Sequence, residues 1–261
     1  MLKEEIKFSD SDIFEGMPSV SAILKAYQNK DYDRRIIKIL FDESKLSSKR
    51  REYNFLKAKS KQFNFRIETV DIDTINKLSV GNTHGGVLAF CTERNIPELT
   101  PDSVKESGIY YILEGIEDPY NFGYSIRSIY ASGADGIILD HRNWMGAAGV
   151  VARSSAGASE LIDMHLCDAV DAIKIFKNKG YTTVCAGIRN SVSLFDAELK
   201  KPLLVIIGGE KRGISRSVLD LADKIVRIDY GTEFNGSLSA AAAASIISFD
   251  VMRKNINKIR N

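Results

Sequence analysis

Apolar residues along the chain fall into short continuous runs, typical of buried strands, and into segments spaced as on one face of a helix. In the first half this pattern predicts strands at 34–42, 65–70 and 86–92, with helices at 19–30, from about 47, and at 73–79. In the second half it predicts strands at 108–116, 136–140, 161–164, 181–187, 202–209 and 224–229. Helices are expected up to residue 131, around 145–153, at 215–222, and from about 237 onward. This alternation indicates an α/β fold in both halves.

A polar, non-periodic segment at 94–107 interrupts the pattern and contains two of the five prolines. Such composition marks a connection between domains. We therefore predict a smaller α/β domain at 1–93, a linker at 94–107 and a second domain at 108–261. The continuous apolar run at 203–207 predicts that the second domain contains a parallel sheet covered on both faces.

Composition narrows the class of protein. Apolar residues make up 44% and charged residues 27%, which is ordinary for a globular protein, and the net charge of +2 excludes nothing. The amino terminus is charged and no apolar run approaches the roughly 18 residues of a membrane span. Three isolated thiols (Cys91, Cys167 and Cys185) suit a reducing compartment. We expect a cytoplasmic protein without a membrane partner.

The stretch from Lys45 to Arg66 holds eight basic residues and one acidic residue, Glu52. Aromatic residues interleave with them: Tyr53, Phe55, Phe63 and Phe65. Cations neutralise phosphate and aromatic rings stack on unpaired bases, so this stretch predicts RNA binding. The alternative is a helix with a solvated basic face, in which Tyr53, Phe55 and Leu56 point into the core.

Three other kinds of site are not supported by the residues present. The turn at 208–215 nearly spells a phosphate-binding loop, but Ile214 stands where that mechanism needs lysine. A dinucleotide fingerprint is absent, because Gly115 and Gly123 have the wrong spacing. The three histidines (His84, His141 and His165) have no second ligand at metal-binding spacing, so we expect no metal.

Three segments at the carboxyl ends of predicted strands carry the recognisable chemistry: 121–127, 208–213 and 228–237. They read DPYNFGYSIR from Asp118, GGEKRG from Gly208, and Ile228 followed by FNGS from Phe234. In this order and context, residues 108–255 resemble the SpoU-type (TrmH-like) RNA ribose 2′-O-methyltransferases of the knotted SPOUT superfamily. The third motif departs most, with Ile-Asp-Tyr where the family usually has Ile-Pro-Met.

Two further stretches are similar to parts of this family. The segment RSSAGA from Arg153 to Ala158 is similar to a small-residue stretch between the first two motifs. The first domain is similar, in its order of elements and its Gly-Gly-Val strand, to the ribosomal-protein-like substrate-binding domain ahead of many members. These likenesses favour an RNA-binding domain joined to a parallel-sheet, knotted methyltransferase domain.

The resemblance implies the cofactor, the site and the partners. The cofactor is S-adenosylmethionine, and the substrate is RNA, with ribosomal RNA favoured over transfer RNA. It implies a homodimer and a deep knot near the final helix. The implied catalytic residues are Arg127, Asn121, Glu210, Asn235 and Ser237, and the implied cofactor-binding residues are Gly208, Gly209, Gly213, Ile228 and Phe234.

Chemistry suggests a role for each catalytic side chain. A guanidinium is a poor proton acceptor, so we expect Arg127 to grip a phosphate and to stabilise the developing alkoxide. A phosphate oxygen, Glu210 or water would take the proton. Asn121 is expected to orient Arg127, while Asn235 and Ser237 either bind substrate or cofactor or cap a helix locally. A non-catalytic RNA-binding protein on a decayed scaffold is the alternative from another class.

Overall fold

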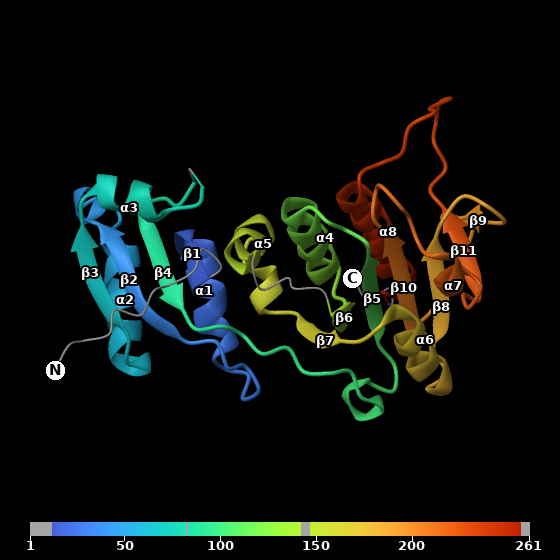
Figure 1. Ribbon diagram of the computed structural model, residues 1–261, viewed down its shortest axis with the longest axis horizontal. Coiled ribbons are helices and arrows are strands. Elements are labelled where there is room, and N and C mark those ends of the chain that lie inside the picture. Colours follow the sequence, from blue (N-terminus) through green and yellow to red (C-terminus); the bar gives the residue numbers. More distant parts are fainter. Residues whose placement is uncertain (1–11, 82, 142–146, 257–261) are drawn as a thin grey trace, which may run out of the picture. The chain divides into compact units, whose positions relative to one another are not determined.

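The computed structural model describes residues 12–81, 83–141 and 147–256 (Figure 1). The chain forms two compact units. The first combines residues up to Asn95 with the segment 143–161, and the second combines 96–142 with 162–261. Part of the helix expected around 145–153 lies outside the described residues. No helix among the described residues has the length and apolar character needed to cross a membrane.

The first unit is built on a four-stranded sheet with the order β1-β4-β2-β3. Its strands are β1 (Ile13–Glu15), β2 (Ile36–Asp42), β3 (Arg66–Val70) and β4 (Val87–Cys91). Strands β2 and β3 are parallel, whereas β4 is antiparallel to both β1 and β2. Its helices are α1 (Gly16–Ala26), α2 (Arg50–Phe63), α3 (Ile72–Leu78) and α5 (Ala148–Ser154), with 3-10 turns η2 (Glu43–Lys45) and η5 (Ala158–Glu160).

Both faces of this sheet are covered. Helices α1, α2 and α5 enclose the larger core, which includes Phe14, Ile23, Phe41, Leu56 and Ala152. On the other face a smaller cluster gathers around Ile75 of α3. Strand β1 has only three residues, which is too short for an apolar pattern to reveal it.

The second unit contains a seven-stranded sheet with the order β7-β6-β5-β10-β8-β11-β9, and all its neighbours are parallel. The strands are β5 (Ile109–Glu114), β6 (Gly136–Leu139), β7 (Asp163–Leu166), β8 (Thr182–Ala186), β9 (Val192–Ser193), β10 (Leu203–Gly208) and β11 (Lys224–Arg227). The helices are α4 (Pro119–Ala131), α6 (Ala169–Asn178), α7 (Arg216–Leu219) and α8 (Ala240–Asn255), with a 3-10 turn η3 (Pro101–Ser103).

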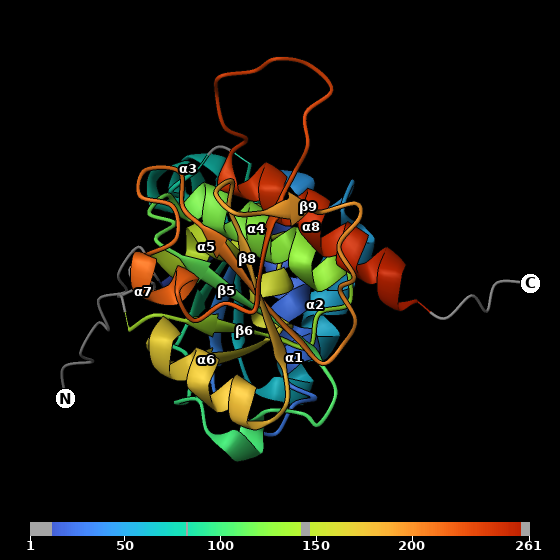
Figure 2. The same cartoon turned by 90° about the vertical axis from the view of Figure 1, so that its right-hand side faces the viewer.

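Helices cover this sheet on two sides. Helices α4 and α8 pack together on one face, while α6 and α7 pack together on the other (Figure 2). The expected burial of the central strand is confirmed, because residues 203–207 of β10 are all buried. The sequence prediction of a parallel α/β sheet is therefore confirmed for this unit.

Several element boundaries differ from the predicted ones. The final helix begins at Ala240 rather than near 237, because the Ser239 side chain accepts a hydrogen bond from the Ala242 amide and caps the helix there. Helix α7 is a single turn of four residues instead of eight. The amphipathic helix α6 begins at Asp168, whose carboxylate caps Val170, and was not among the predicted helices.

Candidate active site

The candidate active site lies where the two central strands of the seven-stranded sheet end. Strands β5 and β10 pair in parallel up to Gly208 and Glu114, and the Gly209 amide then donates to the Glu114 carbonyl at 2.7 Å. From β5 the chain continues through α4 to β6 on one side, whereas from β10 it continues through α7 to β11 on the other. Open α/β sheets bind ligands at such reversals, beyond the carboxyl ends of the strands.

The first motif opens helix α4. Asp118 is the capping residue, and its carboxylate accepts from the Asn121 amide at 2.9 Å. Pro119 occupies the first helical position, where no amide donor is needed. The Asp-Pro pair therefore fixes the helix start and places Asn121 in its first turn, at the carboxyl edge of the sheet.

Glu210 joins the motifs together. Its Oε1 atom accepts from Nδ2 of Asn121 at 2.9 Å and from the Ala240 amide at 3.2 Å. One carboxylate oxygen thus connects the second motif to the start of α4 and to the first turn of α8. A carboxylate is favoured at a helix N-terminus, where main-chain amides lack partners.

The expected contact between Asn121 and Arg127 is wrong, because the Asn121 side chain binds Glu210 instead. The two residues are six positions apart, and at about 100° per residue they point in directions about 240° apart around the helix. Arg127 is exposed on α4, and no other described residue forms an ion pair or hydrogen bond with its side chain. Its guanidinium is available for a ligand.

The third motif lies on the loop between β11 and α8, residues 229–237, all of which are exposed. The loop projects away from the rest of the second unit in both views (Figures 1 and 2). The rings of Tyr230 and Phe234 pack at 5.7 Å between centroids, and the Tyr230 hydroxyl accepts from the Leu238 amide at 3.3 Å. Asn235 and Ser237 make no hydrogen bond with other described residues, so local capping does not explain either of them.

The glycines of the second motif permit close approach of main chains. A Cβ atom on Gly208 would lie 2.5 Å from the Gly213 carbonyl carbon, and one on Gly209 would lie 2.1 Å from the Gly115 oxygen. Gly213 has φ of +64° and open space beside it. Glycine is therefore required at 208 and 209 by the protein's own packing, before any ligand is considered.

The residues around this turn fit S-adenosylmethionine. The turn after Gly209 is exposed main chain at the carboxyl edge, with open space at Gly213, and so offers amide and carbonyl groups rather than bulky side chains. Ile228, directly after β11, is half-buried and supplies an apolar contact. Main-chain recognition of this kind suits a nucleoside next to apolar side chains.

A second candidate surface lies on helix α2 of the first unit. Arg50, Arg51, Lys57 and Lys61 are exposed, and none forms an ion pair with another described residue. Phe55 lies among them with 41% of its surface exposed. The alternative of a purely core-facing aromatic set is therefore wrong for Phe55, although the other aromatics of this stretch pack against or within the core: Tyr53, Phe63 and Phe65.

Comparison with known proteins agrees with both surfaces. Residues 108–249 match the SpoU rRNA Methylase family, and residues 14–97 match a family described as RNA 2′-O ribose methyltransferase substrate binding. The 23S rRNA (guanosine-2′-O-)-methyltransferase RlmB of a Burkholderia species is 25% identical, covering 95% of this chain and 98% of that protein. A protein of the TrmH family of tRNA/rRNA methyltransferases from Staphylococcus saprophyticus is 35% identical, covering 72% and 77%.

Solved structures share the fold. An RNA 2′-O ribose methyltransferase has a TM-score of 0.76 at 20% identity, covering 93% of this chain and 88% of that one. The AdoMet-bound rRNA methyltransferase from Sinorhizobium meliloti has a TM-score of 0.74 at 20% identity, covering 92% and 86%. AviRb from Streptomyces viridochromogenes, in complex with AdoMet, has a TM-score of 0.70 at 23% identity, covering 93% and 89%.

Proposed function

The chain belongs to the SpoU rRNA methylase family, and we propose that it transfers a methyl group from S-adenosylmethionine to a ribose 2′-hydroxyl of ribosomal RNA. The family makes it an RNA 2′-O-ribose methyltransferase, and ribosomal RNA is the finer proposal. The observation that carries the activity is the junction at Glu210. It gathers the start of α4, the turn after β10 and the start of α8 at one edge of the sheet.

Arg127 is proposed to act on the RNA. When bound, S-adenosylmethionine supplies an electrophilic methyl group, which the ribose oxygen takes while losing its proton. The exposed guanidinium of Arg127 can hold a phosphate with two parallel hydrogen bonds and can stabilise charge developing on the ribose oxygen. Asn235 and Ser237, whose side chains make no hydrogen bond with other described residues, supply further donors and acceptors to the same ligands.

The cofactor is proposed to bind at the turn after β10. Gly208, Gly209 and Gly213 shape this turn, and the main chain near Ile228 and Phe234 reads the adenine. The deep knot and the role of each residue here stay predictions of the family resemblance. Calorimetry of the pure, folded protein with S-adenosylmethionine tests the assignment, and absence of binding with and without RNA would remove it.

Helix α2 is proposed to hold the RNA. Its four unpaired cations can neutralise phosphates, and Phe55 can stack on an unpaired base. Changing Arg51 and Lys57 to Gln should weaken RNA binding and reduce its salt dependence by about two phosphate contacts' worth, with a slope change of roughly 0.7 to 0.9 per contact. Binding of S-adenosylmethionine should be unaffected by these changes.

The test of the reaction is methylation mapping in cells that lack this chain. A ribose methylation should disappear from ribosomal RNA and return with the wild-type chain but not with Arg127→Ala. Arg127→Lys should also lose activity severely, because an ammonium cannot form the paired contact of a guanidinium. Loss of a site from transfer RNA instead would assign the other RNA class.

Two further features are proposed. A homodimer is proposed through the α4–α8 face, where Tyr120, Tyr124 and Phe249 are 41 to 47% exposed, and light scattering of Tyr124→Glu should then report a monomer. A cytoplasmic location is proposed because the cysteines are free thiols, two of them buried. Burial raises the pKa of Cys185 to about 12, so this thiol stays protonated and unreactive.

A further inference from the structure

The segment 147–161 leaves the catalytic half of the sequence and folds into the first unit. It lies between β6 and β7 in the chain and within the residues that match the methylase family, yet it packs with the RNA-binding unit. Ala152 of α5 is fully buried in the larger core of that unit. Gly157 has φ of +85°, and a Cβ atom there would lie 2.4 Å from the Ala22 Cβ atom. The segment is therefore closely packed against α1.

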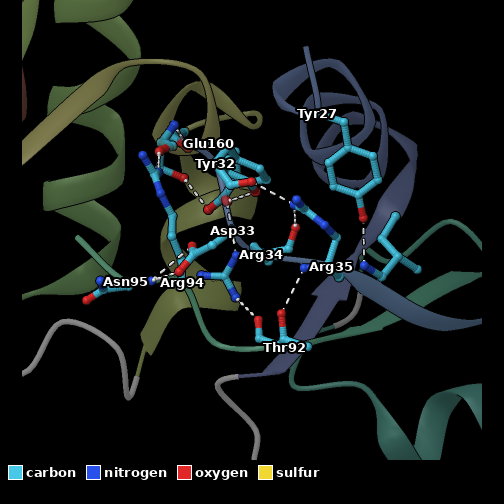
Figure 3. Close-up of polar contacts among 12 residues, drawn as sticks. Tyr27, Tyr32, Asp33, Arg34, Arg35, Thr92, Arg94, Asn95 and Glu160 are labelled. Atoms are coloured by element: carbon cyan, nitrogen blue, oxygen red, sulfur yellow. Dashed lines mark hydrogen bonds and ion pairs between the residues drawn. The ribbon is translucent and has the colours of Figure 1, made fainter. Parts of the chain in front are cut away.

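A buried ion pair fixes the end of this segment. Oε2 of Glu160 lies 3.1 Å from Nε of Arg34, and the two side chains are 4% and 2% exposed (Figure 3). The Tyr32 hydroxyl donates to the same carboxylate oxygen, and Nη1 of Arg34 donates to the Thr92 carbonyl at 2.9 Å. Burial acts against the charged form of Arg34, but the Glu160 carboxylate outweighs it and raises the pKa of the guanidinium.

Two further contacts hold the segment. Nη1 of Arg153 lies 2.6 Å from Oε2 of Glu15, a side chain that also accepts from the amides of Val80 and Gly81. A Cβ atom on Gly81 would fall 1.4 Å from Nη1 of Arg153, so only glycine leaves room for this guanidinium. The segment is thus held at both ends by largely buried charges rather than by surface pairs, which contribute little.

We propose that Glu160 and Arg153 are positioning residues of the methylation reaction. This proposal rests on the proposed function. The chain passes between the two units three times, at 95–96, 142–143 and 161–162, and Glu160 stands only three residues before β7. A unit tied by a single polar linker would sample many orientations, whereas fixing this segment shortens the free chain beside β7. RNA held on α2 is thereby presented to the catalytic sheet in a restricted set of orientations.

Glu160→Gln removes the charge that balances Arg34 and should loosen this connection. The experiment uses the full chain and an unmodified rRNA transcript that the wild type methylates. We expect the single-turnover rate at saturating RNA to fall about 10- to 100-fold, because small misplacements of reacting groups cost this much. The dissociation constants for RNA and for S-adenosylmethionine should stay within twofold, and Glu160→Asp should recover part of the rate.

The controls separate positioning from simple loss of structure. Asp171→Asn neutralises one partner of an exposed pair with Lys174 in the other unit and should leave the rate unchanged. Should Glu160→Gln lose its native circular dichroism, Tyr32→Phe, which removes only the hydroxyl on Glu160, decides by the same criterion with at least a threefold fall in rate. An unchanged rate, or RNA affinity that falls in parallel with the rate, overturns the proposal. A wild-type chain that methylates no rRNA transcript contradicts the proposed function instead.

Discussion

Replacing Glu210 by Gln and by Ala separates two ways in which this side chain can serve methyl transfer. Its Oε1 atom accepts from Asn121 and from the Ala240 amide, so Gln keeps both bonds through its carbonyl oxygen and Ala loses both. We take about 1.5 kcal/mol for each charge-assisted bond at this exposed position and about 1 kcal/mol for its neutral counterpart. Gln then loses about 1 kcal/mol of organisation, or roughly fivefold in rate, and Ala about 3 kcal/mol, or roughly 150-fold.

The assay is the initial rate of transfer of labelled methyl groups into an rRNA transcript at saturating substrates. If Glu210 accepted the proton itself, Gln would lose a further 10²- to 10⁴-fold, the range typical of a general base. A Gln variant as inactive as the Ala variant would therefore refute the organising role. Glu117→Gln is the matched control, because it breaks the nearby exposed pair with Lys211 at 2.9 Å and should change the rate less than twofold.

Three other outcomes are expected. Gly209→Ala should abolish cofactor binding in calorimetry and lower the melting temperature, because its Cβ atom would lie 2.1 Å from the Gly115 oxygen; normal binding would show that the turn adapts. Phe176→Ala should cost about 3 to 5 kcal/mol in urea unfolding, since the ring is fully buried; a cost under 1 kcal/mol would contradict its core position. Burial opposes the Asp223 carboxylate, but bonds from Lys177 and Thr183 outweigh it and lower its pKa, so its stabilisation is present above the usual pKa near 3.8 and lost as the pH falls through the lower folded value. Asp223→Asn should accordingly lower the melting temperature at pH 7 and have progressively less effect below about pH 4; an equal effect at both pH values would exclude the linkage.

The second unit was predictable from sequence because its strands are buried on both faces. Continuous apolar runs such as 203–207 report burial directly, whatever neighbour the strand finds. The approach of Asn121 to Glu210 also follows, since both come directly after strands whose carboxyl ends share an edge. The Ala240 amide could not be assigned, because its place depends on where α8 begins. Ser239, a capping residue before a run of alanines, was the available signal.

The placement of the segment 147–161 was not predictable by the same means. Glu160 and Arg34 are 126 residues apart, and a local pattern of charges does not tell a buried pair from two solvated residues. The role of Phe55 needed the structure for a related reason. Four aromatics interleave with cations in one stretch, and only helix geometry decides which of them faces outward.

The buried pair between Arg34 and Glu160 also sets an order for synthesis of the chain. The first unit has most of its residues once Asn95 has been made, but its core lacks Ala152 and its buried guanidinium lacks a counter-charge until Leu161 follows, 66 residues later. At ~5–20 residues per second, translation takes roughly 3–13 s to cover that interval. During this time the incomplete core is open on the nascent chain, so the RNA-binding unit finishes folding only after the ribosome has made the first two strands of the catalytic sheet.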